Sequence, residues 1–261
     1  QLGAGYRAIP RETEAVNKNL TTNEVIFSDG IEYRNETFYN LTLGTDYHIN
    51  DLNVLTLSGN FAYEIEGQPS ETNFRFFDTN NQLLSSWLRK EVTEATNPKY
   101  QYEINYKKQF KNNEEHTLQF SALGRFFGKD LSSEFNDATV SGSDNNSMQK
   151  VKTDYKHADY IFKADYINPI NEEYTLEAGT QYVLNDVGNN YEVKELIDGE
   201  YITNEDLTNN FDYDQSVLGI YSTGAYEKNK WGIKAGVRIE QTHLTTVLTD
   251  TNEKNEQNFT N

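Results

Sequence analysis

The residues whose types and spacing could do chemistry are charged side chains set inside otherwise apolar, alternating segments. In each of these segments every second residue is largely apolar, so the charges of one segment share a side. Charges gathered on one wall of a sheet indicate contact with water, and in a channel they would tune what passes. The seven candidates are Glu103, Lys107, Arg125, Lys163, Glu177, Lys234 and Arg238.

No pattern in the chain predicts a catalytic residue, a cofactor-binding residue or a metal ligand. The four histidines, His48, His116, His157 and His243, are scattered without the spacing of a zinc site. The run 143–146 offers oxygen ligands to calcium but lacks the spacing and the closing Glu of an EF-hand. Glycine-rich phosphate loops and nucleophile elbows do not occur. We therefore expect no enzymatic activity.

The segments that carry the charges alternate apolar and polar residues over about eleven positions, as β-strands with one apolar face do. They come in four pairs, and long polar stretches separate one pair from the next. Strands of about 9–11 residues joined by short turns and long loops in alternation are typical of a transmembrane β-barrel. The expected hairpins span about 38–65, 98–127, 154–185 and 211–242, with short turns at 50–52, 111–115, 168–172 and 227–230.

Aromatic residues gather near the ends of the predicted strands, where a membrane barrel carries its two aromatic girdles. One set flanks the short turns: Tyr47, Phe110, Tyr166, Tyr174 and Trp231. The other set lies near the long loops: Tyr39, Tyr63, Tyr100, Phe126, Tyr160, Tyr182 and Tyr213. In the strand that begins near Phe211 we expect Tyr213, Val217 and Tyr221 on the apolar face and Leu218 and Ile220 on the other. We predict an all-β fold, an antiparallel up-and-down transmembrane β-barrel; the alternative is a soluble β-sandwich or solenoid.

Composition agrees with an exported β protein. The chain has 18 Tyr and 14 Phe against 4 Pro and no Cys, and aromatics in alternating patterns argue against disorder despite a net charge of −18. This acidity disfavours nucleic acid as a partner, because phosphates attract Lys and Arg clusters. It indicates a solvated acidic surface, or outer loops that gather cations. No apolar run approaches the roughly 20 residues of a membrane-spanning helix.

The long stretches 10–37, 66–99, 128–153 and 186–210 and the tail after Thr242 are expected outside the cell, because barrels place short turns in the periplasm. Three of them carry hairpin signals of their own, at 28–30, 78–82 and 198–199. With the end of an earlier strand at Gln1–Ile9, the count is about nine strands, whereas bacterial barrels usually have an even number. We therefore expect residues 1–261 to form a single partial barrel domain that belongs to a larger barrel. The start at Gln1 without a leader predicts that any export signal lies outside this sequence.

The amino-acid sequence of three segments, 42–61, 158–184 and 209–242, resembles the outer-membrane β-barrel family related to TonB-dependent receptors. This resemblance implies location in the outer membrane, in contact with its lipid, and ligand uptake or surface binding through extracellular loops. It also implies a plug domain and a TonB-type energy-coupling protein as partners, reached through an N-terminal region not visible here; the seven charges would then also decide how the plug packs. The alternatives are a structural or accessory barrel that holds a partner protein at the surface, and a soluble exported β-domain.

Overall fold

The computed structural model describes residues 1–111, 113–251 and 253–261, and in these ranges it contains β-strands and no helix. No helix in the described residues is long and apolar enough to cross a membrane. The strands are β1 (Leu2–Lys18), β2 (Val25–Asn50), β3 (Asn53–Phe77), β4 (Leu83–Phe110), β5 (Asn113–Gly142), β6 (Ser147–Pro169), β7 (Tyr174–Ile197), β8 (Glu200–Thr203), β9 (Asn209–Lys228), β10 (Trp231–Leu248) and β11 (Glu253–Thr260).

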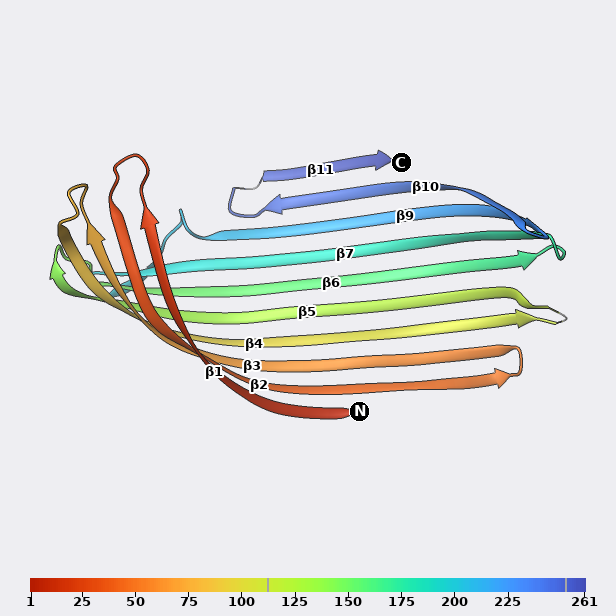
Figure 1. Ribbon diagram of the computed structural model, residues 1–261, viewed down its shortest axis with the longest axis horizontal. Helices are drawn as coiled ribbons and strands as arrows, with labels where there is room; N and C mark the ends of the chain where they lie inside the picture. The colour runs from red at the N-terminus through yellow and green to blue at the C-terminus, as the bar shows by residue number, and fades with distance from the viewer. Residues whose placement is uncertain (112, 252) are drawn as a thin grey trace.

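All the strands belong to one antiparallel sheet, in which each pairs with the next along the chain except that β9 passes over β8 to pair with β7. The order is β1-β2-β3-β4-β5-β6-β7-β9-β10-β11, and the short β8 pairs with β7 alone. Figure 1 shows a single curved layer with β1 and β11 at opposite edges, so the sheet does not close. The predicted all-β meander is confirmed as a partial barrel. The structure has eleven strands in its described residues against the expected count of about nine. β8 is the second arm of the hairpin expected at 198–199 and was not counted as a strand, and β11 lies in a tail too polar to show alternation.

The register is staggered in the way that barrel closure requires. A single row of paired residues runs from Tyr47 in β2 through Phe120 in β5 to Ile239 in β10. Tyr47 lies three residues before the end of β2 at a short turn, whereas Ile239 lies eight residues after the start of β10 at another short turn. Because the row climbs across the sheet, the strands tilt relative to the axis about which the sheet curves.

The strands are far longer than a membrane requires, and this corrects the predicted loops. The stretches expected as long loops are mostly strand: β5, for example, runs for 30 residues. Of the three hairpin signals, those at 78–82 and 198–199 are confirmed, because β3 ends at Phe77 and β7 ends at Ile197. The one at 28–30 is wrong: β2 continues through it, and the turn lies at 19–24. Of the short turns, the one at 111–115 includes Asn112, which lies outside the described residues.

The sheet has no packed interior. Among the described residues the buried hydrophobic side chains are Ala95, Val151, Ala158 and Val193 alone, whereas many large apolar side chains are exposed. Leu57, Phe120, Phe162 and Val237 share one face, and no second sheet or helix covers them. A soluble sandwich buries one face of each sheet against the other, so the sandwich and the soluble exported domain are both excluded.

Candidate functional site

The face that carries Leu57 and Val237, here called the apolar face, holds a continuous band without charge. Paired residues of neighbouring strands lie on the same side of a sheet, so the register assigns every second residue to this face. Eight strands that are neighbours in the sheet, from β2 to β10 without β8, each have a stretch in which the apolar-face positions contain no Asp, Glu, Lys or Arg. This uncharged band comprises the apolar-face positions of 39–47, 55–65, 98–106, 118–128, 158–166, 174–184, 216–226 and 231–241.

The band has the height of a bilayer interior. Its strand segments cover eight to ten residue steps, as from Tyr39 to Tyr47 and from Leu55 to Ile65, which at about 3.3 Å per residue is ~26–33 Å along the strand. A tilt of about 40° reduces this to a height of ~20–25 Å. The outward apolar belt of an outer-membrane barrel is about 25 Å tall. Above the band the apolar face becomes charged at once, with Lys156, Asp186 and Asp214 as its next residues in β6, β7 and β9. Charge begins where lipid tails would end.

The five aromatic residues predicted beside the short turns lie on the apolar face at the end of the band nearest those turns, with Phe110 beyond the band next to Lys108. Phe110 packs edge-on against Tyr166, with ring centroids 6.3 Å apart, and Tyr174 lies 4.7 Å from Tyr226. Tyr47 and Trp231 are exposed, Trp231 by 83%. Phenol, indole and phenyl rings placed this way suit a lipid–water boundary.

One strand was assigned to the wrong faces by sequence. Leu218 and Ile220 of β9 lie on the apolar face, in rows with Tyr182 and Thr180, whereas Tyr213, Val217 and Tyr221 lie on the opposite face. The prediction was based on β9 alone, in which aromatic residues are more frequent at odd than at even positions. Pairing with β7 overrides that local count, because a strand takes its register from its neighbour.

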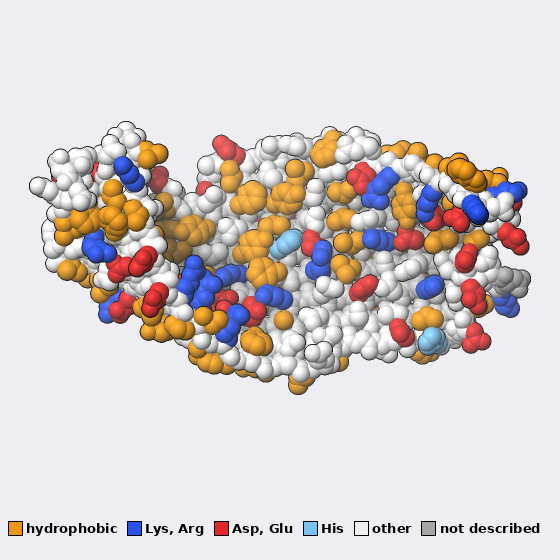
Figure 2. Space-filling model, viewed as in Figure 1, with side chains coloured by type: hydrophobic (Ala, Val, Ile, Leu, Met, Phe, Trp, Pro, Cys, Tyr) orange, Lys and Arg blue, Asp and Glu red, His pale blue; other side chains and the backbone are white. Residues whose placement is uncertain are grey.

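The seven predicted charges all lie on the opposite face, here called the polar face. Lys234 pairs with Glu177 at 2.8 Å, Arg125 with Asp159 at 3.3 Å, and Arg238 with Glu240 at 2.7 Å. Within the described part of the chain no ion pair involves Glu103, Lys107 or Lys163. Figure 2 shows acidic and basic side chains intermingled with hydrophobic ones over the visible side, with no patch of a single sign.

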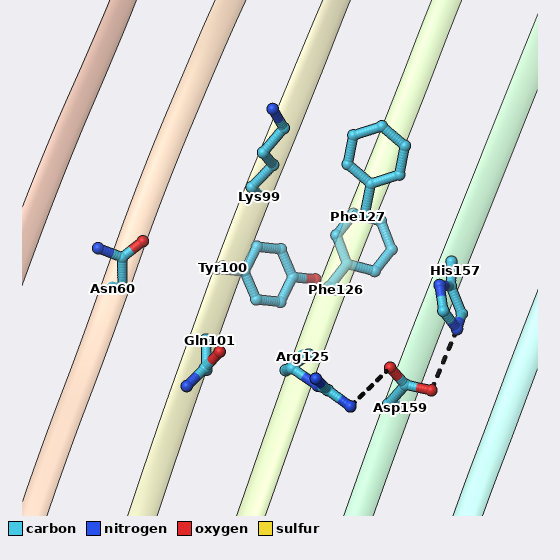
Figure 3. A pocket seen from close by; sticks show the side chains of 9 residues that line it. All are labelled: Asn60, Lys99, Tyr100, Gln101, Arg125, Phe126, Phe127, His157 and Asp159. Atoms are coloured by element: carbon cyan, nitrogen blue, oxygen red, sulfur yellow. Dashed lines mark hydrogen bonds and ion pairs between the residues drawn. The ribbon is translucent and has the colours of Figure 1, made fainter.

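One hollow on the polar face lies at the upper edge of the band and has a volume of about 360 Å³. Asp159 lines it and has two partners there: it forms an ion pair with Arg125, whose Nη2 is 3.3 Å from Oδ2, and its Oδ1 lies 3.1 Å from His157 Nε2. Figure 3 shows these three side chains converging between β5 and β6, with Gln101 across from them on β4. The sequence predicted Arg125, whereas His157 appeared only as one of four scattered histidines and Asp159 was not singled out.

Another hollow has a volume of about 640 Å³ and lies further toward β10. Three of the predicted charges line it, Lys163, Glu177 and Arg238. The hydroxyl of Tyr221 donates a hydrogen bond to Asp165 in this hollow. Sequence analysis missed this pair because it placed Tyr221 on the apolar face.

Above the band the two faces exchange character. The polar face there carries aromatic side chains, among them Phe74, which stacks on Trp87 with ring centroids 5.0 Å apart. Next to this stack Arg89 donates two hydrogen bonds to Asp137, at 2.7 and 2.8 Å. The contact with this buried carboxylate raises the pKa of Arg89, which therefore stays charged. The alternation that marks the band thus does not extend into the rim, as we call the strand portions above it.

The arrangement offers no site for a metal within the residues that the structure describes, because no group of three His, Cys, Asp or Glu side chains converges there. What it offers is one uncharged surface the height of a bilayer, backed by a polar and charged wall with hollows. A staggered, antiparallel sheet with these two faces is the wall of a transmembrane β-barrel.

Comparison with protein families agrees with this class. Residues 108–261, more than half of the chain, match the model of the outer membrane protein beta-barrel family. The chain belongs to this family and is an outer-membrane protein. The matched region begins at the end of β4, and β1 to β4 continue the same meander and the same uncharged band beyond it. Comparison with curated proteins gives no match.

Proposed function

We propose that this chain forms part of the wall of a TonB-dependent receptor-like barrel, which takes up or binds a ligand through extracellular hairpin tips. The observation that carries the proposal is the polar face within the band. Three of its charges, Glu103, Lys107 and Lys163, have no ion-pair partner in the described structure. Unpaired charges need water or a ligand, so they favour an aqueous interior over a sealed one.

The difference between the two ends of the sheet supports a direction for the barrel. At one end the strands are joined by short turns, as at 51–52 and 229–230, and the aromatic girdle lies beside them. At the other end every strand from β2 to β7 continues well above the band. We propose that the short turns lie in the periplasm and the rim lies outside the cell, as in other bacterial barrels. A plug domain and a TonB-type energy-coupling protein are the partners that this function requires.

A second function, a barrel that holds a partner protein at the surface without transport, is favoured by the size of the rim. In β5 the rim takes up residues 129–142, nearly half of the strand. Rims of this size provide a surface for a partner whether or not anything passes through the barrel.

Thiol labelling on intact cells separates the two functions, because the chain has no Cys. In the full-length protein, Lys163→Cys places one thiol on the polar face and Ile239→Cys places one in the band. A small membrane-impermeant thiol reagent is expected to label the first and leave the second, which faces lipid, unlabelled. For an energised importer, an uncoupler that removes the proton-motive force changes the labelling rate at position 163.

Each outcome has one meaning. A rate at position 163 that is unaffected by the uncoupler supports the non-transporting barrel. Failure to label position 163, with a loop-tip thiol labelled in parallel, contradicts an aqueous interior and therefore the uptake proposal. Labelling of position 239 contradicts the membrane assignment of the band.

A further inference from the structure

We propose that the hollow around Asp159 is a binding subsite for a neutral carbohydrate unit. The inference rests on the proposed function and names the ligand class for that same wall. The hollow lies on the polar face at the upper edge of the band, where a ligand arriving from the rim would first meet the barrel interior. Its volume of about 360 Å³ falls within the range of small-molecule sites, about 300–1,000 Å³.

The charges that line the hollow are already compensated. Lys99 Nζ lies 2.8 Å from the carboxylate of Glu64, and Arg125 lies 3.3 Å from Asp159. A phosphate or carboxylate ligand would have to displace one of these acidic partners. A cationic ligand would have to displace Arg125 from Asp159. The electrostatics therefore favour a ligand without net charge.

The hollow nevertheless presents many hydrogen-bonding groups. Asn60 and Gln101 each present an amide oxygen and an amide nitrogen, of which Asn60 already donates one N–H to Thr42, and they lie in the same row as Arg125 and Asp159. The guanidinium of Arg125 and the carboxylate of Asp159 add planar groups that bind two neighbouring hydroxyls at once. Donors and acceptors side by side match a ligand whose hydroxyls do both.

An apolar surface adjoins these groups. Phe127 lines the hollow, and its ring lies 5.8 Å from that of Tyr155 on the polar face of the next strand. Figure 3 shows the Phe127 ring further along β5 than the Arg125–Asp159 pair, and Lys99 Nζ lies 5.6 Å from its centroid, so the aromatic surface bounds the hollow beyond the polar groups. A sugar ring has the same division, with hydroxyls at its edge and C–H groups on its faces.

A peptide is the less suitable occupant. Extended peptides are commonly held through their main chain by a free strand edge. The strands that line the hollow, β3 to β6, are paired on both sides along the row, so no strand edge is available there. Binding must use side chains alone, which suits hydroxyl groups.

An array of immobilised neutral oligosaccharides, acidic oligosaccharides and uncharged peptides tests the proposal with the full-length protein in detergent. We expect binding to at least one neutral oligosaccharide, and we expect Gln101→Ala and Phe127→Leu each to weaken it at least tenfold. Asn105→Ala is the matched control, because Asn105 lies on the polar face of the same strand as Gln101, outside the hollow. It is expected to bind like the unaltered protein.

Three results would overturn the proposal: no binding to neutral oligosaccharides, a preference for acidic sugars or peptides, or binding that the two hollow variants leave unchanged. A shift in gel mobility on boiling shows that each variant is folded. These results are distinguishable from failure of the proposed function, because thiol labelling at position 163 and its response to the uncoupler do not depend on any sugar.

Discussion

Ile220 and Tyr221 are consecutive residues of β9 that face opposite sides of the sheet. Ile220 lies on the apolar face, 59% exposed, in the middle of the uncharged band. Tyr221 lies on the polar face and donates its hydroxyl to Asp165. One step along the strand therefore separates a residue that meets lipid from a residue that meets water.

The first prediction places a charge on either side of this strand. Ile220→Lys is expected to destabilise the folded barrel by about 2–4 kcal/mol, the cost of lysine near the middle of a bilayer. Thr223→Lys lies on the polar face beside Glu177 and is expected to cost less than about 0.5 kcal/mol. Urea titration of folding into lipid vesicles measures both. Equal effects of the two variants would show that the faces of β9 are assigned wrongly.

The second prediction concerns direction across the membrane. Thr79→Cys lies at the exposed tip between β3 and β4, and Lys230→Cys lies in the short turn between β9 and β10. On intact cells a bulky impermeant maleimide is expected to label position 79 but not position 230. After the outer membrane is permeabilised, both are expected to react. The reverse labelling pattern would show that the barrel has the opposite orientation in the membrane.

The third prediction compares an ion pair in the rim with one on its surface. Asp137 is only 7% exposed, whereas Arg89 is 38% exposed and lies between the rings of Phe74 and Phe135. Arg89→Ala leaves a buried carboxylate with Ser147 as its remaining side-chain donor, and we expect a cost of about 2–3 kcal/mol.

Asp137→Ala leaves a guanidinium that water can reach, and about 1 kcal/mol is expected. Lys90→Ala is the control, because its pair with Glu71 is exposed on both sides and should contribute less than about 0.5 kcal/mol. Hydrogen exchange of β4 and β5 amides reports the local loss. An Asp137→Ala effect as large as that of Arg89→Ala would contradict the asymmetry.

The band was predictable because lipid imposes one rule on every strand. Wherever hydrocarbon covers a face, every second residue avoids charge, and this periodicity is visible in segments such as 39–49 and 231–240 without any knowledge of pairing. The rim was not predictable in the same way. Water reaches both of its faces, so no single face is required to be apolar, and residues 66–99 were taken for loop although most of them form strand.

Gly30 illustrates a second limit. In sequence, Ser28-Asp29-Gly30 indicates a turn, yet Gly30 lies inside β2, and a Cβ there would approach the carbonyl oxygen of Glu71 to 2.4 Å. The glycine allows β2 and β3 to approach each other closely at this point. The true turn is held by Asn19, whose side-chain oxygen accepts from the backbone of Thr21 at 2.9 Å. Local composition does not distinguish these two uses of glycine.

The last prediction uses two glycines that do need a left-handed backbone. Gly142 and Gly199 have φ of 82° and 86°, a conformation that costs an L-residue roughly 1–2 kcal/mol. Around Gly199 nothing lies within 4 Å of an added Cβ, whereas at Gly142 that atom would come within 1.9 Å of the carbonyl oxygen of Leu84.

Gly199→Ala is therefore expected to loosen only the hairpin of β7 and β8, by about 1 kcal/mol. Gly142→Ala must also push the end of β5 away from β4, so we expect it to cost more than Gly199→Ala and to open the β4–β5 edge to proteolysis. Limited proteolysis of the folded protein in detergent, with the cut sites mapped by mass spectrometry, compares them. Cleavage near residue 142 in neither variant, or in both equally, would mean that steric contact with Leu84 does not control this end of the rim.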